Sequence, residues 1–270
     1  MSHGVVMLGA GGRMGRTIVR LLLEGTVEEL SLCGALEQTG HSGVGQDSGL
    51  MAGSSACSIL ISDDFAEAAA DAAVGIDFSF HESTAVHAAQ MAGAGKAMVI
   101  GTTGLSNKEI AEVQRAADSI PIVMAPNMSL GVNLLLCLAE SAASALKGRG
   151  YDIEIEERHH RLKKDAPSGT ALGLGEAVAT GLGVNLPDLA VHGREGIVGE
   201  RTNEEIGFHA TRAGDIVGDH TVLFATSGEI VELSHRATSR DTFAIGALRA
   251  AAWVVGQEPG LYSMRDVLAL

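Results

Sequence analysis

The residues Val5-Val6-Met7-Leu8-Gly9-Ala10-Gly11-Gly12-Arg13-Met14-Gly15 decide the fold class of this 270-residue chain. An apolar run leads directly into a glycine-rich turn, and the turn opens a helical pattern over Met14–Glu24. Glycines at such a turn let backbone N–H groups approach a pyrophosphate at the positive end of a helix. The third glycine, Gly15, comes one place later than in the strict dinucleotide fingerprint. The strand-turn-helix context still favours a dinucleotide site over a purely structural turn.

Short apolar runs alternate with helical patterns through the first half of the chain, which is typical of an α/β fold with a doubly wound parallel sheet. The expected strands are Val5–Leu8, Leu30–Leu36, Cys57–Ile61, Val74–Phe78, Ala97–Ile100 and Pro121–Met124. The expected helices are Met14–Glu24, Asp64–Ala72, Ser83–Ala92 and Asn107–Asp118. Ser106 and Glu109 match a capping box before the last of these helices. Gly40–Ser55 has no helical period and predicts a long surface insertion.

The pattern changes near residue 127, where a domain boundary is expected. A long apolar helix is predicted over Leu130–Leu146, followed by a half-exposed strand over Tyr151–Glu157 in which isoleucines alternate with acidic residues. Further strands are expected at Glu204–Arg212, His220–Thr226 and Glu229–Ala237. The second part is therefore predicted to be a smaller α+β domain with an open sheet. Periodicity does not show which part the helix Phe243–Val255 joins.

Composition and charge exclude several classes of protein. Lys+Arg 19 against Asp+Glu 33 gives a net charge of −14, which argues against nucleic acid or an anionic membrane as a partner. The cysteines, Cys33, Cys57 and Cys137, have neither disulfide-framework nor zinc-site spacing, which fits a reducing cytoplasm. The chain starts without the pattern of a signal peptide, and no apolar run has the length of a membrane span.

Other residues at predicted strand ends support a nicotinamide dinucleotide. Glu37 stands 22 positions after Gly15, where an acidic side chain would bind the adenosine ribose hydroxyls. The alternative interpretation of Glu37 is a solvated carboxylate at the end of a strand. Two loops at strand ends could hold the nicotinamide, although ordinary turn chemistry would also select their residues. These loops are Gly101-Thr102-Thr103-Gly104 and Ala125-Pro126-Asn127-Met128.

A basic segment, residues 158–164, points to an anionic substrate, because six of its seven residues are Arg, Lys or His in an acidic chain. Ser168-Gly169-Thr170 then opens the helical pattern Ala171–Thr180, and a helix start is a second anion acceptor. Two adjacent acceptors suit a dicarboxylate, with histidine as the natural proton donor near neutral pH. One alternative is a solvated basic turn paired with the acidic strand Asp152–Glu157. A metal site at His159-His160 is another, disfavoured because adjacent side chains diverge.

Together these motifs resemble the 4-hydroxy-tetrahydrodipicolinate reductase family, also called dihydrodipicolinate reductases. The most specific part is His159–Ala171, which reads His-His-x-x-Lys-x-Asp-Ala-Pro-Ser-Gly-Thr-Ala. The resemblance implies an enzyme of lysine and diaminopimelate biosynthesis that uses NAD(P)H. It would convert (S)-4-hydroxy-2,3,4,5-tetrahydrodipicolinate to 2,3,4,5-tetrahydrodipicolinate and water. It also implies that residues 241–270 complete a dinucleotide domain of residues 1–127, and that residues 128–240 bind substrate and form a homotetramer.

The resemblance implies roles for individual residues. His159 would donate a proton, Lys163 would assist protonation and hold a carboxylate, and the substrate would also contact His160, Gly169 and Thr170. No metal is expected. The implied cofactor contacts are Gly9, Ala10, Gly11, Gly12, Arg13, Met14, Glu37, Gly101, Thr102, Thr103, Ala125, Pro126, Asn127 and Met128.

One departure from the family bears on cofactor choice. Several members have Arg after the acidic residue, where this chain has Gln38. A neutral amide gives up the charge-assisted contact to the 2′-phosphate of NADPH, and Glu37 repels that phosphate. NADH is therefore expected to be favoured, with NADPH also used because Arg13 and Arg16 are close in the sequence.

Three rival functions make different demands on the chain. An acylating dehydrogenase needs a thiolate nucleophile, and no cysteine here stands in a polar loop beside a histidine. Another imine or keto-acid reductase would share the scaffold and differ only in substrate. A nicotinamide-sensing binding protein would bind nucleotide without turnover, so changing His159 separates it from an enzyme.

Overall fold

The computed structural model describes residues 2–270. The chain forms two compact units, a first unit of residues 1–130 and 241–270 and a second unit of residues 131–240. The boundary expected near residue 127 lies close to the division after Leu130. The helix that periodicity did not assign belongs to the first unit.

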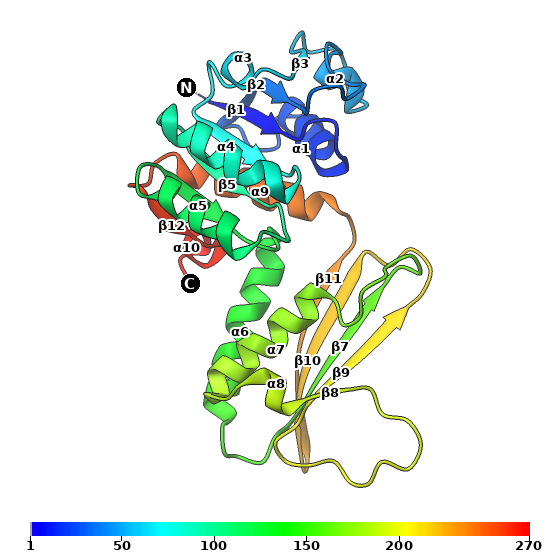
Figure 1. Cartoon of the computed structure of the whole chain (residues 1–270). Coiled ribbons are helices and arrows are strands. Elements are labelled where there is room, and N and C mark those ends of the chain that lie inside the picture. The colour runs from blue at the N-terminus through cyan, green and yellow to red at the C-terminus, as the bar shows by residue number, and fades with distance from the viewer. Residues whose placement is uncertain (1) are drawn as a thin grey trace. The chain divides into compact units, whose positions relative to one another are not determined.

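A seven-stranded parallel sheet forms the centre of the first unit, in the order β12-β6-β5-β4-β1-β2-β3. Figure 1 shows this unit with β1, β2, β3, β5 and β12 labelled. The strands are β1 (His3–Leu8), β2 (Leu30–Leu36), β3 (Ile61–Ser62), β4 (Val74–Asp77), β5 (Ala97–Ile100), β6 (Pro121–Met124) and β12 (Gly260–Tyr262). Val5 and Met7 of β1 lie in one apolar cluster, and Val6 and Leu8 lie in another. Because successive side chains of a strand point to opposite faces, both faces of the sheet are covered. The predicted doubly wound sheet is confirmed.

Helices cover the two faces of this sheet. They are α1 (Arg13–Leu23), α2 (Ser48–Met51), α3 (Phe65–Ala68), α4 (His81–Gly93), α5 (Asn107–Ala117), α9 (Asp241–Val254) and α10 (Met264–Leu268). α1 and α9 bury apolar residues such as Ile18 and Leu248 in the cluster of Val5. Met91 of α4 and Val113 of α5 lie in the other cluster. The capping box of Ser106 and Glu109 is present at the start of α5.

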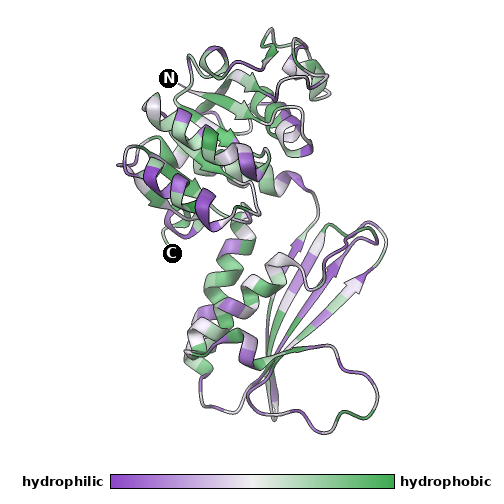
Figure 2. Ribbon diagram, viewed as in Figure 1, coloured by the Kyte–Doolittle hydropathy of each residue, from purple (hydrophilic) through white to green (hydrophobic). Residues whose placement is uncertain are grey.

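The second unit contains a five-stranded mixed sheet, in the order β11-β10-β7-β9-β8 (Figure 1). Its strands are β7 (Asp152–His159), β8 (Ala190–His192), β9 (Ile206–Arg212), β10 (Gly218–Thr226) and β11 (Glu229–Ala237). Its helices are α6 (Leu130–Leu146), α7 (Gly169–Leu182) and α8 (Leu186–Leu189). Ile155 and Phe224 pack with Leu135 and Leu174 on the helix-covered face. Figure 2 shows hydrophilic and hydrophobic residues mixed along these strands, as in a sheet with one polar face.

Several predicted elements are wrong in length. The strand Cys57–Ile61 is reduced to β3, and the helix Asp64–Ala72 is reduced to α3, which Asp64 caps. The insertion Gly40–Ser55 contains the short helix α2. Four short elements were not predicted from the sequence. They are β8, α8, β12 and α10, which have three to five residues each, too few for a period to show. Among residues 2–270, no helix combines the length and apolarity needed to cross a membrane.

Candidate active site

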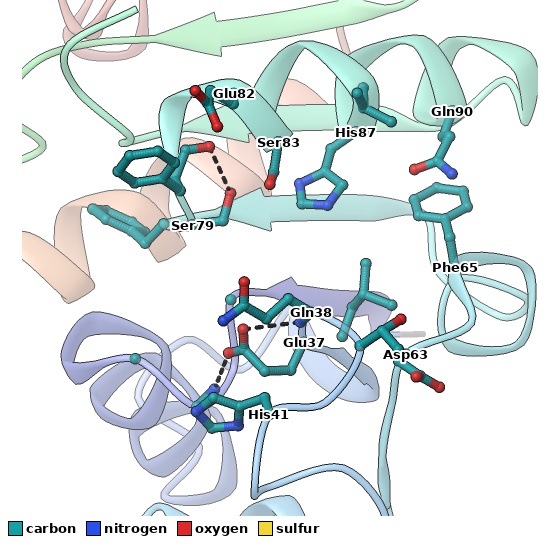
Figure 3. A pocket seen from close by; sticks show the side chains of 18 residues that line it. Glu37, Gln38, His41, Asp63, Phe65, Ser79, Glu82, Ser83, His87 and Gln90 are labelled. Carbon is teal, nitrogen blue, oxygen red and sulfur yellow. Dashed lines mark hydrogen bonds between the residues drawn. The ribbon is translucent and has the colours of Figure 1, made fainter.

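A cavity of about 560 Å³ opens at the carboxyl ends of β1, β2 and β4. β1 has β2 as its neighbour on one side and β4 on the other, so the strand order reverses at β1. Doubly wound sheets bind ligands at such a topological switch point. Side chains of α4 face Glu37 and Gln38 across the cavity (Figure 3). Its lining includes Gly9, Gly11, Gly12, Glu37, Gln38, His41, Asp63, Phe65, Phe78, Ser79, Phe80 and His87.

The glycine loop after β1 is shaped by close backbone approaches. Gly9 has a φ of +86°, and a Cβ there would lie 2.7 Å from the carbonyl oxygen of Phe78. A Cβ on Gly15 would lie 2.1 Å from the carbonyl oxygen of Gly9, so the glycine at this late position is needed to seat α1 against the loop. No side chain caps α1, and no acidic residue stands in its first turn. This positive helix end fits the pyrophosphate of a dinucleotide.

Glu37 lies against this glycine loop. Its Oε2 accepts a hydrogen bond from the Gly11 N–H at 2.8 Å, and its Oε1 accepts from the Gln38 N–H at 3.0 Å (Figure 3). In dinucleotide-binding folds, a carboxylate at the end of the second strand binds the adenosine ribose. Arg16 donates from Nε to the Gly11 carbonyl oxygen at 2.9 Å. Neither Arg13 nor Arg16 lines the cavity, and its lining within residues 2–270 contains no Lys or Arg.

A buried carboxylate, Asp77, joins the loops on the other side of the cavity. Its Oδ1 accepts from the hydroxyls of Thr102 at 2.5 Å and Ser79 at 2.8 Å, and its Oδ2 lies 2.6 Å from Nδ1 of His87. Burial raises the pKa of the Asp77 carboxyl, but the hydrogen bonds from His87, Thr102 and Ser79 outweigh it and hold the pKa below its usual value. Asp77 is therefore ionised and fixes Thr102 of the predicted nicotinamide loop.

The other expected cofactor residues lie at the same edge of the sheet but outside the cavity lining. Ala10 is buried within the glycine loop, and Arg13 and Met14 form the first turn of α1. The loop after β6 is tied to the end of β5, since Ala125 donates to the Ile100 carbonyl oxygen at 3.2 Å. Residues that do not line the cavity are Ala10, Arg13, Met14, Gly101, Thr102, Thr103, Ala125, Pro126, Asn127 and Met128.

The first residues of the basic segment belong to a strand of the second unit. β7 continues to His159, so Arg158 and His159 are strand residues whose side chains point to opposite faces of the sheet. Arg158 is exposed and lies 3.7 Å from Glu156, whereas His159 is 8% exposed. Arg158 is thus a solvated residue paired with an acidic side chain of the strand, as the alternative interpretation of the basic segment expects. The side chain of His159 lies on the other face of the sheet from that of Arg158.

His159 is held between a carboxylate and a glycine. Its Nδ1 lies 2.5 Å from Oε2 of Glu157, and a Cβ on Gly218 would lie 3.0 Å from its Nε2. Burial lowers the pKa of His159, the positive charges of Lys163 and Arg212 lower it further, and the Glu157 carboxylate opposes them only in part. The imidazole is therefore mainly neutral at neutral pH, and it gains a proton more readily when negative charge arrives beside it.

Lys163 and His160 lie in the turn after β7. The ammonium of Lys163 pairs with both carboxylate oxygens of Asp165, at 2.9 and 3.0 Å. His160 accepts a hydrogen bond at Nδ1 from the Leu162 N–H at 3.2 Å. Lys163 is thus paired with a residue of its own turn rather than with the acidic strand. Its partner Asp165 is largely exposed, so an arriving anion can compete for the lysine.

The predicted helix start is present as the N-terminus of α7. Ser168 caps it by accepting from the Ala171 N–H at 3.2 Å. A Cβ on Gly169 would meet nothing within 4 Å, so the first residue of the helix is open to a ligand. Ser168 also lies 3.1 Å from Nε2 of the buried His220, whose pKa burial lowers to about 4. Thr170 stands in this same first turn.

Both halves of the chain match models of one family. Residues 3–128 match the model described as dihydrodipicolinate reductase, N-terminus, and residues 131–268 match the model of its C-terminus. The chain belongs to the dihydrodipicolinate reductase family. The resemblance stated from the sequence is confirmed.

Individual relatives of this family member agree with that assignment. Proteins named 4-hydroxy-tetrahydrodipicolinate reductase from Halorhodospira halophila and Thiobacillus denitrificans are 51% and 52% identical to it, over 100% of both chains in each case. The solved structure of a dipicolinate-bound dihydrodipicolinate reductase from Paenisporosarcina sp. TG-14 has a TM-score of 0.77 at 22% identity. It covers 98% of this chain and 99% of the other, which supports the fold.

The structure adds residues to this family member's candidate site that the sequence analysis did not single out. The sequence predicts Asp77 only as part of a strand, and Glu157 only as part of an acidic strand. A period of two along β7 puts Glu157 on the face of Ile153 and Ile155, so an acid at a core position was a readable signal. Arg212, which meets Glu157, carried no such signal. No group of three or more His, Cys, Asp or Glu in residues 2–270 is arranged to hold a metal ion.

Proposed function

We propose that this chain reduces (S)-4-hydroxy-2,3,4,5-tetrahydrodipicolinate with NAD(P)H to 2,3,4,5-tetrahydrodipicolinate and water, within diaminopimelate and lysine biosynthesis. Identity of 51% over the full length of a reductase of that name carries the proposal. The dinucleotide-fitting cavity and the histidine beside an anion-accepting helix start agree with it. The enzyme is an oxidoreductase of nicotinamide cofactors.

The glycine loop and the start of α1 hold the dinucleotide pyrophosphate, and Glu37 binds the adenosine ribose. The loops after β5 and β6, Gly101–Thr103 and Ala125–Met128, hold the nicotinamide end. When bound, the cofactor supplies a hydride from C4 of the nicotinamide. The protein contributes position and charge at this site, because Asp77 fixes Thr102 in one orientation.

The substrate is a small dicarboxylate, held at one carboxylate by Lys163 and at the other by the start of α7 through Gly169 and Thr170. His160 contributes a further contact. The negative charge of the substrate opposes the effect of Lys163 and Arg212 on His159, so the imidazole takes up a proton as substrate binds. His159 then donates a proton from Nε2 to the ring of the substrate, and Lys163 assists this protonation. A dipicolinate-bound relative has the same fold, which agrees with a dicarboxylate ligand.

NADH is the favoured cofactor, with NADPH also used. The cavity lining carries carboxylates, among them Glu37 and Asp63, and Gln38 offers no charge to a 2′-phosphate. Arg16 is occupied by the Gly11 carbonyl oxygen, which weakens the reason for expecting it to meet that phosphate. We also propose that the protein is cytoplasmic and forms a homotetramer through the open sheet of residues 128–240. Sedimentation equilibrium tests the tetramer.

A coupled assay tests the function. The unstable substrate is generated in place from pyruvate and aspartate semialdehyde by its synthase, and the oxidation of NADH and NADPH is followed separately. Substrate-dependent oxidation that is faster with NADH supports the whole proposal. Oxidation with another imine or keto acid only would support the rival reductase. Dinucleotide binding without any oxidation would support a sensor.

His159→Gln separates the catalytic role from binding. Loss of a general acid lowers turnover by about 10²-fold to 10⁴-fold, and the dissociation constant of NADH should stay unchanged because the cavity holds no part of His159. Calorimetric titration with NADH is the binding measurement. Full turnover in this variant would remove His159 from the mechanism.

A further inference from the structure

The buried carboxylate of Glu157 has no role in the mechanism above. Its residue is 1% exposed, and it accepts every hydrogen bond that it makes. Arg212 donates to Oε2 from Nη1 at 2.8 Å and to Oε1 from Nη2 at 2.7 Å. The Ser168 N–H donates to Oε1 at 3.1 Å, and Nδ1 of His159 lies 2.5 Å from Oε2. Burying a charge is costly, and Ile155 on the same face shows that an apolar residue suits this strand.

The arrangement determines which nitrogen of His159 carries the exchangeable proton. Burial raises the pKa of the Glu157 carboxyl, but the hydrogen bonds from Arg212 and His159 hold it below its usual value, so Glu157 is a carboxylate that can only accept. Nδ1 of His159 must therefore carry a hydrogen in both the neutral and the charged imidazole. Nε2 is left to gain and lose the proton, and it lies beside Gly218, where a Cβ would come within 3.0 Å of it.

The same carboxylate connects three parts of the candidate site. Arg212, while bound to Glu157, also donates from Nη2 to the Asp165 carbonyl oxygen at 2.6 Å, in the segment that carries Lys163. Ser168, whose N–H is bound to Glu157, caps the start of α7. A single buried group thereby sets the proton donor, the lysine-bearing turn and the anion-accepting helix start relative to one another.

We propose that Glu157 is a positioning residue for the reaction: it holds Nδ1–H of His159 so that Nε2 is the proton-donating atom, and with Arg212 it fixes the lysine-bearing turn. The inference rests on the proposed function for its catalytic meaning. The groups that face His159 are Glu157 on β7, Arg212 on β9, His220 on β10 and Lys163 in the turn after β7. Glu157 is the carboxylate among them, and its removal leaves only cationic or neutral neighbours.

Nitrogen-15 NMR of histidine-labelled protein, without substrate, tests the positioning directly. The His159 signals are assigned by their loss in His159→Gln. In the wild type, neutral His159 should be the Nδ1–H tautomer. In Glu157→Gln the imidazolium loses its anionic partner, so His159 should titrate at lower pH. An Nε2–H tautomer in the wild type would overturn the proposal whether or not the variant folds. An unmoved titration in a folded variant would overturn it as well.

Kinetics of the whole enzyme test the consequence. Glu157→Gln should lower kcat by about 10²-fold or more, and the fall of kcat with rising pH should begin at lower pH. The KM for NADH should not change. Glu156→Gln is the matched control, because Glu156 precedes Glu157 on β7, is half exposed and meets Arg158 on the other face. Equal losses in both variants, or a lower kcat with an unmoved pH profile, would reduce Glu157 to a structural role.

Failure of the two proposals can be told apart. An inactive wild type in the coupled assay contradicts the proposed function. The tautomer and titration of His159 are measured without turnover, and they contradict or support the positioning role alone.

Discussion

Nε2 of His159 lies close to the backbone of Gly218. A Cβ there would lie 3.0 Å from Nε2, and the glycine does not have a left-handed φ, so alanine can adopt its backbone conformation. We expect Gly218→Ala to lower kcat by roughly 10-fold to 10²-fold through displacement of the imidazole. Thermal unfolding should change little, and NADH binding should not change. Wild-type turnover in a folded variant would show that Nε2 is not the reacting edge.

Gln38 provides a prediction on cofactor choice. In Gln38→Arg a guanidinium stands at the cavity wall, where it can meet a 2′-phosphate. The cavity lining within residues 2–270 contains no Lys or Arg in the wild type. A hydrogen bond to a charged group contributes about 1.5–3 kcal/mol, so kcat/KM for NADPH should rise by roughly 10-fold to 10²-fold while that for NADH changes little. Gln90→Arg, on α4 at the cavity wall, is a control for added charge alone. Equal gains in both variants would point to general attraction instead of a specific contact.

The sequence predicted those residues whose partners are local. Gly9, Gly11, Gly12 and Glu37 follow from one strand-turn-helix-strand passage, and the structure brings these four to a single cavity. Asp77 depends on Thr102, 25 positions away, and Glu157 depends on Arg212, 55 positions away. Such pairs depend on strand order and register. Local patterns in a single sequence do not show either of these. The roles assigned to His159, Lys163 and the dinucleotide loops stay predictions.

At the scale of elements, Asp77 ties β4 to α4 and to the loop after β5. Because the pKa of Asp77 is lower in the folded chain than its unfolded value of about 3.9, ionised Asp77 contributes stability above that pH, and the contribution is lost as the pH falls through the folded pKa. We expect Asp77→Asn to lower the free energy of unfolding by about 3 kcal/mol at neutral pH. The difference should shrink in acid.

Chemical denaturation at several pH values measures this effect. The exposed Asp118 at the end of α5 is the matched control, and Asp118→Asn should leave the unfolding free energy nearly unchanged. NADH binding to Asp77→Asn should also weaken, since Thr102 and Ser79 lose their shared acceptor. A destabilisation that does not diminish in acid would contradict an ionised Asp77.

Some predicted elements have the bounds that the structure shows. They are Leu30–Leu36, Ala97–Ile100, Pro121–Met124, Leu130–Leu146 and Glu229–Ala237, where the apolar or periodic run itself sets the ends of the element. β3 is paired over only Ala35 and Leu36 of β2, so its extent is set by that pairing and not by the apolar run before it. β7 continues two residues beyond the predicted end at Glu157, so His159 is a strand residue.

At the scale of the whole molecule, the chain carries separate apolar cores. Two clusters flank the parallel sheet of the first unit, and the cluster of the second unit contains residues from Leu135 to Phe224. The first unit is discontinuous in sequence, since α9 contributes fully buried residues such as Ala247 and Leu248 to the cluster of β1. The fold class could be predicted because strands and helices alternate through the whole first half of the chain, so the pattern does not depend on any single residue. The return of the last residues to the first unit came only from the family resemblance.

Two compact units predict two unfolding transitions in differential scanning calorimetry of the intact chain. The residues proposed to bind the dinucleotide all lie in the first unit, so NADH should raise one transition and leave the other in place. At a hundred times its dissociation constant, a ligand stabilises the state that it binds by about 2.7 kcal/mol, which corresponds to a rise of roughly 5–10 °C for a unit of this size. Gly15→Ala serves as the comparison, because its methyl group would collide with the Gly9 carbonyl oxygen and disturb the pyrophosphate loop. In that variant the first transition should fall and NADH should no longer restore it, while the second transition stays where it was. A single transition that moves as a whole with NADH would show that the two units unfold as one cooperative body.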